Sequence, residues 1–165
     1  MFPALRPILN KGGAGRYISR AHSAERLQPI AERHLDLMYA YEAILGGMPA
    51  GLSKESLEAL MPYLRTEIAK MSETILSLGG TPPSGVRRVP GGLNLPPQDP
   101  DAGRPALDHV DALLDAERDF GGALRDEADA VHHQERTRAI LNHNAEASDA
   151  RRSALRNLAA DLQRA

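Results

Sequence analysis

The stretch from residue 107 to residue 131 repeats apolar or small residues at alternating intervals of three and four. This spacing places the repeated residues on one face of an α-helix, where they can pack against a neighbour. The face consists of Leu107, Val110, Leu114, Glu117, Gly121, Leu124, Ala128 and Val131. A carboxylate in the middle of such a face must be paired or hydrogen-bonded, because burying it alone costs several kcal/mol. The stretch therefore predicts a bundle helix with a polar group inside the bundle.

The composition fits a helical domain. The chain has 165 residues, which is enough for one domain with a sizeable core. Aromatic residues make up 4% and tryptophan is absent. The core must therefore consist mainly of leucine, isoleucine, methionine and alanine, which suits helices.

The absence of cysteine and the small net charge limit the kinds of site and partner that this chain can have. The chain contains no cysteine, which excludes thiolate metal sites and cysteine nucleophiles and agrees with a reducing cytoplasm. The net charge of −2 gives no general attraction to nucleic acid or to an anionic membrane. No apolar run approaches the ~18 residues of a membrane span, and the first residues lack the continuous apolar segment of a secretory signal. We expect a cytoplasmic protein without a membrane segment.

Three further stretches predict helices. The first spans residues 23–45, and the second spans residues 53–78, with Ser53 as its N-cap and Pro62 as a kink or restart. Pro105 opens the 105–131 helix, and after a break near residues 132–135 the last helix runs to about residue 162. The inward face of the first helix consists of Leu27, Ile30, Ala31, His34, Leu35, Met38, Tyr41 and Leu45. That of the second helix consists of Leu57, Leu60, Met61, Leu64, Ile68, Met71, Ile75 and Leu78. That of the last helix consists of Thr137, Leu141, Asn144, Ser148, Leu155, Leu158 and Leu162.

The connection lengths predict the topology. Short links make each pair of helices an antiparallel hairpin. Residues 80–105 contain seven prolines and five glycines without periodicity, which predicts an extended connection. Twenty-six extended residues reach at most ~86–94 Å, whereas a helix of ~25 residues spans ~38 Å. The connection can therefore cross the whole bundle. We predict an all-α four-helix bundle over residues 23–165, made of two antiparallel hairpins joined by this long crossover.

Residues 1–22 form the predicted flexible N-terminal arm. The arm carries four basic residues, and no acidic residue precedes Glu25. A mobile tail is the favoured interpretation. A basic arm that grips a partner or protects DNA is the alternative.

Several short motifs resemble the ferritin-like superfamily. Residues 73–82 read Glu-Thr-Ile-Leu-Ser-Leu-Gly-Gly-Thr-Pro, similar to the Glu-x-Ile-Leu-x-Leu-x-Gly-x-Pro pattern at the end of the second helix in bacterioferritins. Glu32 and Tyr39, seven residues apart, are similar to that family's metal-binding glutamate and nearby tyrosine. Glu117 followed by Leu124 and Arg125 is similar to the third helix of the family. The resemblance implies a ferritin-like fold, assembly into a homo-oligomer, and iron or manganese in the bundle.

The resemblance implies a partial metal site. Family members bind two irons with a glutamate from the first and third helices and a Glu-x-x-His pair from the second and fourth. In this chain the second-helix pair falls on Leu64 and Glu67. The fourth helix has no Glu-x-x-His, and its nearest matches begin at Asn144 and Glu146.

The candidate metal ligands are Glu117, Glu67 and either Glu32 or His34. Helical phase places Glu117 and His34 inward. Glu67 lies roughly 60° from the centre of its face, where a surface carboxylate is slightly favoured over a ligand, and Glu32 lies roughly 140° away, where periodicity alone predicts an exposed side chain. Glu117 is a ligand, a proton relay, or the buried partner of an arginine or histidine. Arg151 is close to the inward phase and could be that partner, although a solvated Arg151–Arg152 patch is favoured. For His34, a hydrogen-bonded core histidine is favoured over a ligand, and a contact with Glu117 or Glu67 across the bundle would serve either interpretation.

Two functions follow from these residues. The first is a divergent ferritin-like protein that binds iron or manganese at a partial carboxylate site, with di-metal oxidoreductase chemistry if it is an enzyme. The alternative is a non-catalytic helical scaffold or interaction protein that has lost the metal site.

Overall fold

The computed structural model describes residues 20–84, 105–131 and 134–164. Five helices form this part of the chain: α2 (Arg20–Gly47), α3 (Leu52–Glu58), α4 (Met61–Ser77), α5 (Pro105–Ala130) and α6 (Glu135–Arg164). No β-strand occurs among the described residues. The four long helices pack together, which confirms the predicted all-α bundle. The predicted N-terminal arm, except for its last residues, and most of the predicted crossover lie outside the described residues.

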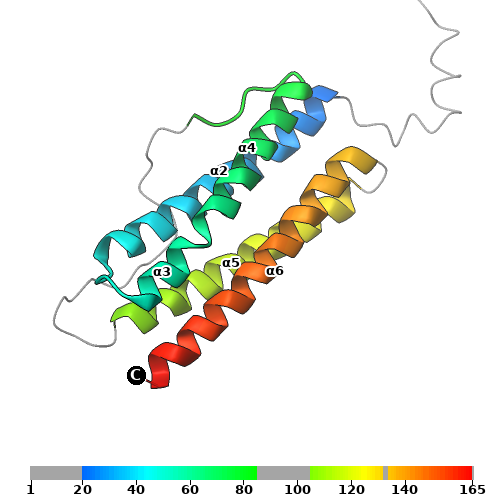
Figure 1. Cartoon of the computed structure of the whole chain (residues 1–165). Coiled ribbons are helices and arrows are strands. Elements are labelled where there is room, and N and C mark those ends of the chain that lie inside the picture. The colour runs from blue at the N-terminus through cyan, green and yellow to red at the C-terminus, as the bar shows by residue number, and fades with distance from the viewer. Residues whose placement is uncertain (1–19, 85–104, 132–133, 165) are drawn as a thin grey trace, which may run out of the picture.

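The long helices form two antiparallel pairs, α2 with α4 and α5 with α6 (Figure 1). The start of α2 meets the end of α4, where the guanidinium of Arg20 donates a hydrogen bond to the main-chain oxygen of Ser77. In Figure 1, α4 ends at one end of the bundle and α5 begins at the other. Consequently α4 and α5 run in the same direction, and the residues between them join opposite ends of the bundle.

The region predicted as the second helix consists of two helices, α3 and α4, and α4 begins next to Pro62, where a kink or restart was expected. Helix α3 ends at Glu58, α4 begins at Met61, and Pro62 occupies the first turn of α4, where its missing N–H is harmless. The prediction that Ser53 is an N-cap is wrong. Helix α3 begins at Leu52, one residue earlier, and its N-cap is Gly51 with φ of 155°. Side chains rarely allow this φ, so glycine fixes the position at which the chain enters the helix.

Two glycines close α4 against α2. Gly79 has φ of 83°, the left-handed conformation that commonly ends a helix. A Cβ on Gly80 would lie 2.7 Å from the Cβ of Ala24 and 3.0 Å from Cγ2 of Ile75. The Leu-Gly-Gly motif therefore lets the end of α4 approach the start of α2 closely.

The buried face of α2 is wider than its stripe predicted. Both α4 and α5 pack against α2, so it is covered on two sides. Leu37, Ala40 and Ile44 are buried although they lie off the predicted face, while Leu35 and Met38 are only partly buried.

The predicted inward face of α6 is buried at every position from Thr137 to Leu158, and its last residue, Leu162, is partly buried. None of the described helices is long and apolar enough to cross a membrane.

Candidate functional site

A cluster of buried polar side chains lies between the four long helices, and we call it the polar core. Each member is 5% exposed or less. Its members are His34 and Tyr41 from α2, Glu67 from α4, Glu117 from α5, and Ser148 and Arg151 from α6. The inward phase of these helices brings together residues that are up to 117 positions apart in the sequence.

Arg151 holds both buried carboxylates of the polar core. Its Nε and Nη2 atoms donate to Oε1 and Oε2 of Glu117 at 2.5 and 3.2 Å. Its Nη1 atom donates to Oε2 of Glu67 at 2.5 Å. Burial disfavours the charged guanidinium, but hydrogen bonds and attraction from Glu117 and Glu67 outweigh it and raise the pKa of Arg151. Two edges of one planar cation thus bind two carboxylates, a geometry that lysine could not reproduce.

Glu117 has a complete set of hydrogen-bond donors. The hydroxyl of Tyr41 donates to Oε1 at 2.6 Å, and the hydroxyl of Ser148 donates to Oε2 at 2.6 Å. Ser148 Oγ also lies 3.0 Å from the main-chain oxygen of Glu117. Burial, followed by the nearby charge of Glu117, raises the pKa of Tyr41, so its hydroxyl keeps its proton. Together with Arg151, these donors offset the cost of burying the carboxylate.

His34 stands beside Glu67 at the edge of the polar core. Its Nε2 atom lies 3.6 Å from Oε1 of Glu67, beyond hydrogen-bond distance. Within the described part of the chain, neither ring nitrogen nor this carboxylate oxygen has a hydrogen-bond partner. Burial lowers the pKa of His34, with Glu67 opposing the shift, so the neutral ring is favoured. Burial alone would raise the pKa of Glu67, but His34 and Arg151 outweigh it and lower this pKa.

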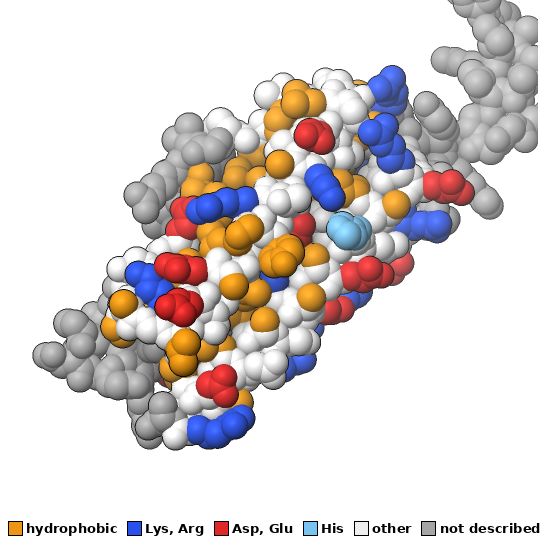
Figure 2. Space-filling model, viewed as in Figure 1, with side chains coloured by type: hydrophobic (Ala, Val, Ile, Leu, Met, Phe, Trp, Pro, Cys, Tyr) orange, Lys and Arg blue, Asp and Glu red, His pale blue; other side chains and the backbone are white. Residues whose placement is uncertain are grey.

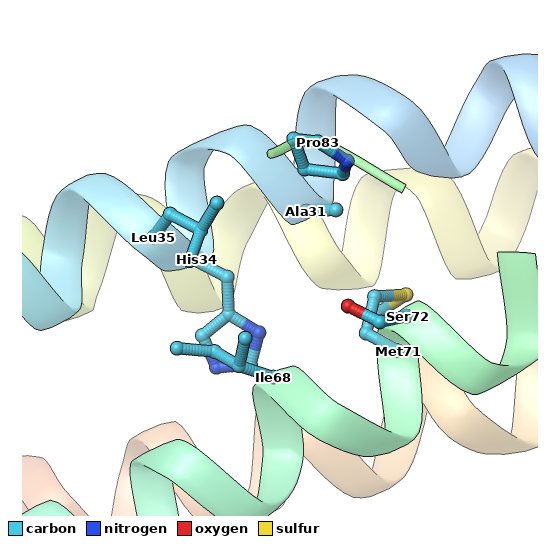
Figure 3. Close-up of a pocket in the computed structure, with 7 residues that line it drawn as sticks. All are labelled: Ala31, His34, Leu35, Ile68, Met71, Ser72 and Pro83. Atoms are coloured by element: carbon cyan, nitrogen blue, oxygen red, sulfur yellow. The ribbon is translucent and has the colours of Figure 1, made fainter. Parts of the chain in front are cut away.

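A narrow crevice between α2 and α4 leads to the imidazole of His34 (Figure 3). The ring of His34 extends from α2 towards Ile68 of α4, and Pro83 lies beside Ala31 of α2 in this view. The lining residues are Ala31, His34, Leu35, Ile68, Met71, Ser72 and Pro83. The crevice leaves no room for a water molecule. Inside the bundle, the ring centre of His34 lies 4.8 Å from that of Phe120.

The structure brings together three of the four predicted site residues. Glu117, Glu67 and His34 all belong to the polar core. Glu32 is only partly buried on α2 and lies outside the polar core, as its helical phase indicated. The favoured interpretation of Arg151 as part of a solvated patch is wrong, because this side chain is 3% exposed and pairs with Glu117.

Sequence reasoning missed part of the polar core. Periodicity predicts Tyr41 and Ser148 only as members of inward faces and gives no role for their hydroxyls. A useful signal was available, because a polar side chain on an apolar stripe needs a partner at the same level of a neighbouring helix. The resemblance indicates Tyr39, which is partly buried, whereas the tyrosine that donates to Glu117 is the fully buried Tyr41.

The residues of the polar core do not fit a two-metal centre. A guanidinium already binds the carboxylates of Glu67 and Glu117, and a metal ion at the same oxygens would be repelled by it. Leu64, at the predicted ligand position, is fully buried and apolar. In residues 20–84, 105–131 and 134–164, no group of three histidine or acidic side chains is placed to hold a metal ion. His143 is exposed, and His132 and His133 lie outside the described residues.

Comparison of the chain with known proteins finds no matching family model and no similar curated protein.

Proposed function

We propose that this chain is a non-catalytic, ferritin-like scaffold in which an arginine–carboxylate network takes the place of a metal site. The observation that carries the proposal is the bonding of Arg151 to both Glu67 and Glu117. A buried cation that neutralises ligand-type carboxylates removes the charge that would attract a metal ion.

The arrangement of the helices supports the ferritin-like part of the proposal. Two antiparallel pairs, with α4 and α5 running in the same direction, agree with a crossover along the bundle. The motif at residues 73–82 ends α4 where a ferritin-like second helix would end.

The polar core has a structural role in this proposal. Arg151 on α6 bonds to α4 and α5, and Glu117 on α5 bonds to Tyr41 on α2. Apolar side chains tolerate sliding between helices, whereas directional hydrogen bonds at one level do not. We therefore expect the polar core to fix the register of all four long helices.

The scaffold acts through its outer surface by self-association. Three large apolar side chains are exposed on α3 and α4, namely Leu52 at 82%, Tyr63 at 69% and Leu76 at 59%. Figure 2 shows apolar side chains along the middle of the visible face, with charged side chains around them. Such a surface is typical of a contact between proteins.

Metal analysis of the purified protein tests the proposal. After loading with iron or manganese and desalting, we expect far less than one metal ion per chain, and thermal unfolding that a chelator does not change. Stoichiometric metal binding that disappears in a Glu117→Ala variant would instead support the partial metal site. An exposed carboxylate on the same helix, Asp119, provides the matched control as Asp119→Ala.

A further inference from the structure

We infer that the outer face of α5 is a docking surface for the basic segment at residues 1–19 of the same chain. This face is acidic, no described helix covers it, and it lies within reach of that segment. The inference concerns the outside of the bundle and does not depend on the proposed role of the polar core.

Six aspartates form a row along the outer face of α5, and we call it the acidic row. Their positions repeat at helical spacing, with Gly122 in the one gap, and all six residues are exposed. At 1.5 Å per residue, the acidic row is about 32 Å long. Its members are Asp108, Asp111, Asp115, Asp119, Asp126 and Asp129.

The arginines of α5 neutralise little of the acidic row. Arg118 lies 3.1 Å from carboxylate oxygens of Asp115 and Asp119. Arg125, the other arginine of α5, pairs with Asp149 of α6 instead. Like charges one turn apart on a helix repel each other. A basic segment that lay along this face would therefore relieve repulsion within α5.

Residues 1–19 carry the charge that complements the acidic row. They contain Arg6, Lys11 and Arg16 and no acidic residue. Residues 85–104 contain three arginines but also two aspartates, so their net positive charge is lower. Attraction between opposite charges is strongest for the segment with the larger net charge. Charge complementarity therefore favours residues 1–19 as the occupant.

The basic segment joins the bundle beside the C-terminal end of the acidic row. Near the start of α2, Arg26 donates to Oε1 of Glu127 on α5 at 2.5 Å, and the hydroxyl of Ser23 donates to the side-chain oxygen of Gln134. Figure 1 shows the start of α2 and the end of α5 at the same end of the bundle. Nineteen extended residues reach about 63–68 Å, roughly twice the length of the acidic row. The segment is therefore long enough to follow the whole row.

A spin label on the basic segment tests the docking. The chain has no cysteine, so a nitroxide on full-length Ala14→Cys is attached at one position only. At about 0.01 M salt, where the screening length is about 30 Å, we expect the label to broaden the amide NMR signal of Gly122 much more than that of Thr66 on α4. At about 1 M salt, where this length is about 3 Å, the difference should be lost.

Two triple variants with the same change in net charge test the acidic row. The first removes three carboxylates that form no ion pair with any described residue, namely Asp108→Asn, Asp111→Asn and Asp126→Asn. The control removes three exposed carboxylates of α3 and α6, namely Glu55→Gln, Glu58→Gln and Glu146→Gln. In the first variant the broadening at Gly122 should fall to the level at Thr66, whereas the control should keep it. Circular dichroism checks that both variants stay folded.

The inference is overturned by an unbroadened Gly122 signal at low salt, or by broadening that both triple variants retain. A mixture of spin-labelled chains without ¹⁵N and ¹⁵N-labelled chains without the nitroxide distinguishes contact within a chain from contact between copies. We expect no broadening of Gly122 in this mixture. Broadening as strong as in the singly labelled sample would assign the segment to a second copy and would also overturn the inference.

Discussion

Glu117 is a fully buried carboxylate, and both of its oxygens accept hydrogen bonds. Arg151 contributes charged donors, while Tyr41 and Ser148 contribute neutral ones. Removing one donor leaves the desolvation cost of the carboxylate in place and removes part of its compensation. Substitutions in the polar core should therefore cost more than the same substitutions on the surface.

Tyr41→Phe tests the contribution of a single hydroxyl. The substitution keeps the ring and removes the donor to Glu117, so we expect the free energy of unfolding to fall by about 1–3 kcal/mol. Tyr63→Phe removes an equivalent hydroxyl from a side chain that is 69% exposed, and should change stability by less than about 0.5 kcal/mol. Urea unfolding followed by circular dichroism measures both. Equal effects would show that the Tyr41 hydroxyl adds nothing to stability.

The stability of the fold should fall at mildly acidic pH because of His34. Burial lowers the pKa of His34 in the folded state, while in the unfolded chain the imidazole titrates near 6.5. As the pH falls, the unfolded state binds a proton first, so the free energy of unfolding decreases from about pH 7.5 towards the lowered pKa. His34→Gln should lose this part of the dependence.

Urea unfolding at about pH 7.5 and about pH 5.5 measures the effect. The control is His143→Gln, at an exposed position on α6, which should keep the dependence of the wild type. An unchanged dependence in His34→Gln would contradict the assignment.

Part of the polar core could be predicted from single helices. Phase alone placed Glu117 and His34 inside, and it admitted Arg151 as the partner of Glu117. The burial of Glu67 could not be predicted in this way, because its position on the flank of α4 is covered by His34 from α2 and by Arg151 from α6. The spacing of residues along the sequence shows on which side of its helix a side chain lies, but not which residue of a neighbouring helix lies opposite it.

The spacing of apolar residues and the positions of proline and glycine predicted most of the helix ends. Pro105 opens α5, Pro62 restarts the second helix, and the break before Glu135 separates α5 from α6. The start of α3 was missed because an N-cap preference for serine competes with the backbone freedom of Gly51. The width of the buried face of α2 was missed because it depends on two neighbouring helices.

Two glycine substitutions distinguish close packing from helix propensity. Gly80→Ala should destabilise the fold by about 1–3 kcal/mol, because its Cβ would lie 2.7 Å from Ala24. Gly122→Ala, in the interior of α5 with nothing within 4 Å of its Cβ, should stabilise the fold by up to about 1 kcal/mol. Thermal unfolding of both variants measures these opposite shifts. A stabilising Gly80→Ala would mean that the two helix ends are not in close contact.

At the scale of the whole molecule, the two helix pairs meet unevenly. Helix α2 packs well against α5, whereas α4 has much less contact with α6. The ion pair between Arg151 and Glu67 is one of the links across this weaker side. An ion pair therefore joins α4 and α6 on the side where these two helices lie close together over the shortest stretch.

The exposed apolar side chains on α3 and α4 predict that the whole molecule associates with copies of itself. We expect the wild type to sediment as an oligomer, and a Leu52→Lys, Tyr63→Lys double variant to shift towards the monomer, because two of the exposed apolar side chains become charged. Sedimentation velocity over a range of concentrations measures this shift. Ala139→Lys, at an exposed position on α6, is the control. A wild type that stays monomeric at high concentration would refute the proposed contact.

The order of the helices along the chain has a consequence for dividing the polypeptide between α4 and α5. A cut between residues 84 and 105 would yield two fragments, each of which carries one antiparallel helix pair. Glu67 would belong to one fragment, whereas Arg151 would stay with Glu117 in the other, so the first half would lose the cation that neutralises its buried carboxylate. Such a split pair should reassemble in trans, with the severed arginine contact acting as the recognition element between complementary halves.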